Sequence, residues 1–146
     1  MNRIWIVAVI FSGMFAFARA PSETSQPVTT MKQLMLDLIH PASNDILLFV
    51  NRGGPKDENE WATVRRSAVT LAEGGNLLMM PGRARDQRDW MKHAKMLADV
   101  GTAAYKAAQA KDMKALATLT EALDASCTTC HKQYRPNVFP QEGGSK

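Results

Sequence analysis

Apolar residues recur every three or four positions along four stretches of the chain, and no stretch alternates apolar and polar residues as a half-buried strand does. The four stretches span residues 28–50, 58–73, 87–110 and 112–134. Short breaks separate them, and the first two breaks contain glycine and proline. The pattern predicts an all-α protein, an antiparallel bundle of four helices.

Each predicted helix has one apolar face that would line the core of the bundle. Pro41 lacks a backbone donor and crowds the preceding turn, so we expect a kink there or two shorter helices. Segment 74–85 is predicted as an apolar loop with at most one helical turn, because glycines and a proline interrupt it. The core-facing residues are Met31, Met35, Leu38, Ala42, Ile46 and Phe49 on the first helix, Trp61, Val64, Ala68 and Leu71 on the second, Trp90, Ala94, Leu97, Gly101, Ala104 and Ala108 on the third, and Leu116, Leu119, Leu123, Cys127, Cys130 and Tyr134 on the fourth.

The only two cysteines, Cys127 and Cys130, lie three residues apart, and His131 follows the second directly. On a helix of about 3.6 residues per turn, these three side chains fall within about 100° of arc and project into one patch. C-x-x-C-H is the attachment signature of c-type haem, in which the thiols add across the two vinyl groups and the histidine becomes an axial iron ligand. The motif predicts one covalently attached haem c per chain.

Other uses of the cysteine pair fit the sequence less well. A zinc site needs four ligands, whereas His40 and His93 lie on other helices and no second cysteine pair exists. A redox-active pair usually stands at the start of a helix that follows a strand, and this pair stands at a helix end. A disulfide between the two cysteines would close a very short loop and stabilise the fold little.

The predicted third helix carries Gly101, Ala104 and Ala108 on its core face, where a bundle usually has larger residues. Small residues opposite the cysteines would leave a slot for a flat cofactor. The alternative is a close contact between two helices of an ordinary bundle.

The first twenty residues read as a secretory signal peptide. Arg3 precedes an apolar run from Ile4 to Phe17, and small residues at positions 18 and 20 suit cleavage after Ala20. The run is too short and poorly flanked for a spanning helix, although an uncleaved anchor is the alternative. We therefore expect export to the periplasm, with no membrane span after cleavage. The expected divisions are a signal peptide at 1–20, a flexible leader at 21–27, a haem-binding bundle at 28–136 and a tail at 137–146.

Charge adds little to this picture. Removing Arg3 and Arg19 with the signal peptide lowers the 18 lysines and arginines to 16, against 14 acids, so the net charge falls from +4 to +2. Acids interleave with the densest basic patches, which argues against a nucleic-acid partner. No general base, nucleophile pair or second metal site is evident, so we do not expect an enzyme.

The chain from 28 to 135 resembles the class II cytochromes c, the cytochrome c-prime family. The resemblance rests on four helices with C-x-x-C-H on the last, near the C-terminus, whereas class I cytochromes c have the motif near the N-terminus. An aromatic and a basic residue follow the motif in the family, as they do here in "CHKQYR". The resemblance implies that Tyr134 packs beside the haem and that Arg135 lies near the ligand imidazole.

The family also divides by its sixth iron ligand, which is either a methionine from the first helix or absent behind an apolar side chain. Met35 is closer than Met31 to the family's ligand position after the "KQ" pair, so we expect Met35 to bind the iron. Met31, His40 or an open position are the alternatives, and His93 is expected at the surface.

One family feature is missing. An arginine often precedes the distal residue by one turn and binds a haem propionate, and this chain has Met31 there. Lys32, Arg83 or Arg85 would have to replace it.

The expected function is electron transfer by a periplasmic monohaem cytochrome, because a methionine–histidine ligand pair raises the reduction potential. Its partners would be periplasmic redox proteins, and the family implies a possible homodimer. One alternative is a five-coordinate haem protein that binds NO or CO. Another is a haem-free helical module stapled by a disulfide, with a role in protein interaction.

Overall fold

The computed structural model describes residues 26–137 of the chain. The predicted signal peptide at 1–20, the leader up to residue 25 and the tail from 138 onward lie outside the described residues.

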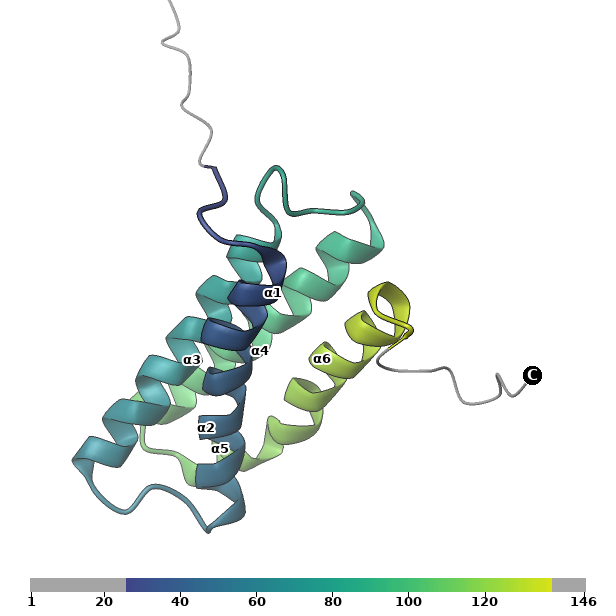
Figure 1. The fold of residues 1–146 in the computed structure, drawn as a ribbon. Coiled ribbons are helices and arrows are strands. Elements are labelled where there is room, and N and C mark those ends of the chain that lie inside the picture. The colour runs from purple at the N-terminus through teal and green to yellow at the C-terminus, as the bar shows by residue number, and fades with distance from the viewer. Residues whose placement is uncertain (1–25, 138–146) are drawn as a thin grey trace, which may run out of the picture.

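The described chain is a bundle of four helical arms, and residues 26–137 contain no strand (Figure 1). This architecture confirms the prediction of an all-α protein and of a helical bundle. No helix in this part of the chain has the length and apolarity to cross a membrane. The elements are α1 (Met31–Gln33), the π-helical η1 (Leu34–Ile39), α2 (His40–Asn51), α3 (Glu58–Leu78), α4 (Asp89–Gln109), α5 (Met113–Thr118) and α6 (Thr120–Tyr134).

The first arm consists of α1, η1 and α2 in unbroken succession. It begins at a capping box, in which the Thr30 hydroxyl accepts from the backbone N–H of Gln33 and the Gln33 side chain accepts from that of Thr30. The arm packs on α3, α3 packs on α4, and α6 packs on α4 (Figure 1). The first arm and α6 therefore each pack on one helix of the central pair α3 and α4.

The π-helical turn changes which residues of the first arm face the core. A π turn contains more residues than an α turn, so Leu34 and Ile39, five residues apart, share the buried face at 2% and 4% exposure. Leu38, which was predicted in the core, is 38% exposed, so that prediction is wrong. The interruption expected at Pro41 takes the form of this turn, and Pro41 itself stands in the first turn of α2.

The second helix is longer than predicted, because α3 continues through Gly74 and Gly75 to Leu78. The predicted loop at 74–85 therefore begins only at residue 79. Both glycines are buried, and a Cβ added at Gly75 would lie 2.7 Å from the carbonyl oxygen of Ala94 on α4. Gly75 thus allows a close approach of α4, Gly74 faces Ile39 of η1, and neither glycine marks a helix end.

The small residues of α4 take part in the same contact. A Cβ at Gly101 would lie 2.4 Å from the backbone nitrogen of Ala72 on α3. Ala104 and Ala108 are also buried, and none of the three small residues lines the cavities beside the cysteines. The predicted slot between these residues and the cysteines is therefore wrong, and the alternative, a close helix contact, is what the structure has.

The fourth predicted helix is divided at Leu119 into α5 and α6. The Asp112 carboxylate caps α5 by accepting from the backbone N–H of Ala115 at 2.9 Å. Leu116 and Leu123 are buried as expected, and α6 ends with Tyr134.

The close packing of α3 on α4 predicts that Gly101→Ala destabilises the protein, although alanine in a helix is usually favoured over glycine by roughly 1 kcal/mol. We expect the free energy of unfolding to fall by about 1–3 kcal/mol, the usual cost of overpacking. Urea unfolding followed by circular dichroism measures it. Thr102→Ala, exposed on the same helix, is the control and should change stability by less than about 0.5 kcal/mol. A more stable Gly101→Ala variant would contradict the close contact.

Candidate functional site

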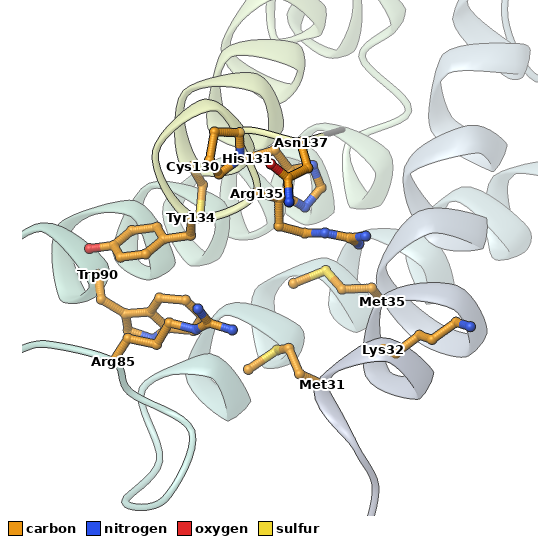
Figure 2. A pocket seen from close by; sticks show the side chains of 11 residues that line it. Met31, Lys32, Met35, Arg85, Trp90, Cys130, His131, Tyr134, Arg135 and Asn137 are labelled. Carbon is orange, nitrogen blue, oxygen red and sulfur yellow. The ribbon is translucent and has the colours of Figure 1, made fainter. Parts of the chain in front are cut away.

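The C-x-x-C-H motif lies on the last turns of α6 and faces the first arm across two cavities. The larger has a volume of about 370 Å³ and the smaller about 30 Å³. Figure 2 shows Met31 and Met35 reaching toward the larger cavity, with His131 across from them and Trp90 and Tyr134 to one side. The larger cavity is lined by Met31, Lys32, Met35, Arg85, Trp90, Cys130, His131, Tyr134, Arg135, Pro136 and Asn137.

The structure brings together most of the residues that the sequence predicts for the site. Met35, Cys130 and His131 line both cavities, Cys127 lines the smaller and Met31 only the larger of the two. Met35 belongs to the π-helical turn, where its carbonyl oxygen accepts from the backbone N–H of residue 40. Irregular turns of this kind are frequent at functional sites.

His40 does not belong to this group. It is exposed, lines neither cavity, and its Nδ1 lies 3.4 Å from the side-chain nitrogen of Asn44 on the same helix.

The two cysteines are half-buried free thiols. Burial raises the pKa of Cys127, and burial together with the neighbouring Cys127 raises the pKa of Cys130 to about 11, although Arg85 opposes the rise. Reactive redox cysteines have a lowered pKa, so this pair differs electrostatically from a redox-active pair.

The pKa of the His131 imidazole is lowered, whereas the pKa values of the two thiols are raised. Burial, followed by the charge of Arg135, lowers the pKa of His131. The neutral form, which binds metals, is therefore favoured at neutral pH. The backbone N–H of Arg135 donates to the carbonyl oxygen of His131 at 2.8 Å, and both side chains line the larger cavity.

His93 differs from its predicted surface position, because it is half-buried and lines the smaller cavity. Its Nε2 lies 3.0 Å from Oε1 of Gln133, and its Nδ1 lies 3.5 Å from the hydroxyl of Thr129. Its ring also contacts Tyr134 edge-on, with centroids 6.2 Å apart. His93 thus links α4 to α6, through partners that lie 36 and 40 residues away in the sequence.

Tyr134 attaches the end of α6 to the start of α4. Its hydroxyl donates to the carboxylate of Asp86, which also accepts from the backbone N–H groups of Arg88 at 2.9 Å and Trp90 at 3.0 Å. The Tyr134 ring packs edge-on against Trp90 at 4.9 Å, and the Trp90 indole donates to the carbonyl oxygen of Leu78 at 2.7 Å. Sequence reasoning missed Asp86, although an acid just before a helix is a usual capping signal.

The hydrogen bond between Asp86 and Tyr134 shifts the pKa of both groups in opposite directions. The Tyr134 hydrogen bond, followed by that from Trp90, lowers the pKa of Asp86 to about 2. Burial, followed by the bond to Asp86, raises the pKa of Tyr134 to about 12.

The lysine and arginine side chains that line the larger cavity give it positive charge without a matching negative charge from the described residues. Lys32, Arg85 and Arg135 line it, and no aspartate or glutamate of the described chain does. Its other walls are mostly apolar or aromatic, so it suits a flat apolar group that carries negative charge.

No group of three or more His, Cys, Asp and Glu side chains gathers as a metal-ion site within residues 26–137. Comparisons of the chain with models of protein families, with curated proteins and with solved structures found no match. The function of the site is therefore argued from its own residues.

The Asp86–Tyr134 bond predicts a pH-dependent stability. Asp86 has a folded pKa of about 2, below the ordinary value of about 3.9, so its contribution is present above about pH 4 and is lost as the pH falls toward 2. The melting temperature of Tyr134→Phe should therefore lie below that of the wild type at pH 6, and the two should converge near pH 2. Tyr105→Phe, which removes a hydroxyl bonded to Gln109, is the control. If the melting temperature of Tyr134→Phe lies below that of the wild type by the same amount from pH 6 to pH 2, the bond does not have this role.

Proposed function

We propose that the protein is an exported monohaem c-type cytochrome that transfers electrons. Haem would be attached through Cys127 and Cys130, with His131 as one axial ligand of the iron. The observation that carries the proposal is that Cys130 and His131 line a cavity with Met31 and Met35 on its opposite wall, and that Cys127 lines the smaller cavity beside it. When bound, haem supplies the Fe(III)/Fe(II) couple that accepts and releases one electron.

The chemistry of the chain supports this use of the motif. Thioether formation requires two free thiols on one helix face, and the half-buried Cys127 and Cys130 are of this kind. Iron ligation requires a neutral imidazole, which the lowered pKa of His131 favours. Trp90 and Tyr134 provide flat apolar walls, as a porphyrin needs.

Met35 is the residue that we assign to the second axial position. It lines both cavities together with His131, whereas Met31 does not reach the smaller one. A thioether ligand opposite histidine raises the reduction potential and suits an electron carrier.

A five-coordinate haem that binds NO or CO is the second candidate function. Met35 is partly buried and packs against the hydrophobic core, so it could also block the iron position without binding it. The haem-free alternative needs a disulfide, and it has less support because Cys127 and Cys130 are both free thiols.

Covalent haem is tested on the protein expressed for export in a bacterium that matures c-type cytochromes. A pyridine haemochrome spectrum of the denatured protein should show one thioether-bound haem per chain. The double variant Cys127→Ala/Cys130→Ala should lose covalent haem, because no thiol remains to add to a vinyl group. Ser126→Ala, which removes a neighbouring hydroxyl, is the control and should keep it. Absence of covalent haem from the wild type would refute the cytochrome and the gas-binding protein together.

Replacing each methionine by leucine separates electron transfer from gas binding. Met35→Leu should convert a low-spin haem to high spin, abolish the methionine-to-iron charge-transfer band and lower the midpoint potential. Met31→Leu, one turn away in the same cavity, is the matched control and should keep the low-spin spectrum. A wild type that is already high-spin, with no change in Met35→Leu, would instead favour the gas-binding protein.

A further inference from the structure

Arg83 is a buried cation without a sufficient set of acceptors. It is 8% exposed, and neither its Nε nor its Nη1 has a hydrogen-bond partner within residues 26–137. Its backbone is held in the loop after α3, where its N–H donates to the carbonyl oxygen of Met80 at 3.0 Å. Burying an unpaired charged group is costly, so such a guanidinium usually has an anionic partner.

The space beside Arg83 is a third cavity, of about 380 Å³, which continues the site already described. Its walls include Thr29, Thr30 and Arg83, and it shares Met31 and Arg85 with the cavity of His131. No aspartate or glutamate of the described chain lines either cavity. A bound anion would supply the missing acceptor.

Arg85 is arranged to serve the same anion. Its guanidinium lies 5.9 Å from the centre of the Trp90 ring, in the wall that the two cavities share. Lys32, from α1, is exposed and lines the larger cavity only. Arg83 and Arg85 thus form a pair of which one member is buried and the other is open to the cofactor cavity.

We propose that Arg83 and Arg85 form a carboxylate site that binds one propionate of the haem, an inference that rests on the proposed function. Arginine presents paired N–H groups that match a carboxylate, which suits Arg83 better than a flexible lysine would. A haem propionate is an anion attached to the group that would fill the neighbouring cavity, and that cavity shares Met31 and Arg85 with this one. Of the three candidates Lys32, Arg83 and Arg85, only Arg83 is buried with unpaired donors.

The test is the pH dependence of the haem midpoint potential in the purified holoprotein. A nearby cation stabilises the ionised propionate, so Arg83→Gln should raise the pKa of the redox-linked ionisation by about one unit or more. It should also lower the midpoint potential at neutral pH, because removal of a positive charge favours the oxidised haem. Arg83→Lys keeps the positive charge but lacks the paired N–H groups of arginine, so the pKa of the ionisation should rise less than in Arg83→Gln. Arg66→Gln, an exposed arginine on α3 that lines neither cavity, is the control and should leave the ionisation unchanged.

Each outcome bears on one proposal. An Arg83→Gln holoprotein with covalent haem and an unchanged ionisation would overturn the carboxylate site and leave the cytochrome intact. A wild type without covalent haem would overturn the proposed function itself.

A free anion in place of the propionate gives a different result. Inorganic phosphate would then shift the wild-type midpoint potential, Arg83→Gln would abolish that shift, and the pKa of the redox-linked ionisation would be the same in both proteins. That result would show that the site binds a free anion and that the propionate assignment is wrong. If Arg83→Gln does not accumulate, the same pKa of the redox-linked ionisation is measured in Arg83→Lys and Arg85→Gln. A pKa equal to that of the wild type in both variants would overturn the proposal.

Discussion

The close contact between α3 and α4 is the constraint on which the rest of the bundle depends. Gly75 and Gly101 lie where each backbone meets the other helix, and a methyl group at either position would collide with main-chain atoms. The two helices therefore form a tight central pair, with the first arm packed on α3 and α6 packed on α4 (Figure 1). The small residues of α4 pack in this contact, and the space beside the cysteines is bounded by larger residues of the flanking arms and of the central pair, among them Trp90 and Leu97.

The position of α6 relative to the first arm follows from how α6 is held. Tyr134 and Gln133 bond to residues near the start of α4, through Asp86 and His93. These contacts fix the motif from the α4 side and leave its other side facing Met35 across the cavities. A group placed there would contact residues from two elements that are held by separate contacts, and residues held in this way form a preorganised site.

The electrostatics of the site agree with its shape. Burial disfavours the charged forms of the cysteine thiols and of His131, so these three side chains are neutral around neutral pH. Lys32, Arg85 and Arg135 line the larger cavity, Arg83 and Arg85 line the neighbouring one, and Arg83 is the buried member of this set. A largely apolar space lined by cations is complementary to an apolar molecule that carries carboxylates, which is why the cytochrome proposal and the carboxylate site support each other.

The sequence by itself determined the helical class, the number of arms and the place of C-x-x-C-H on one face of the last helix, because these depend on local periodicity. Its errors share one cause. Leu38 left the core because a π turn changed the register, and Gly74 and Gly75 stayed helical because η1 and α4, respectively, pack against them, so in both cases the local pattern was misleading. Only the tertiary structure decided that Asp86 and His93 hold α6 and that Arg83 is buried, since these contacts join residues far apart in the chain or depend on how a loop folds back. Local spacing identifies the residues that share a helix face, whereas the neighbour that each face meets depends on packing between elements.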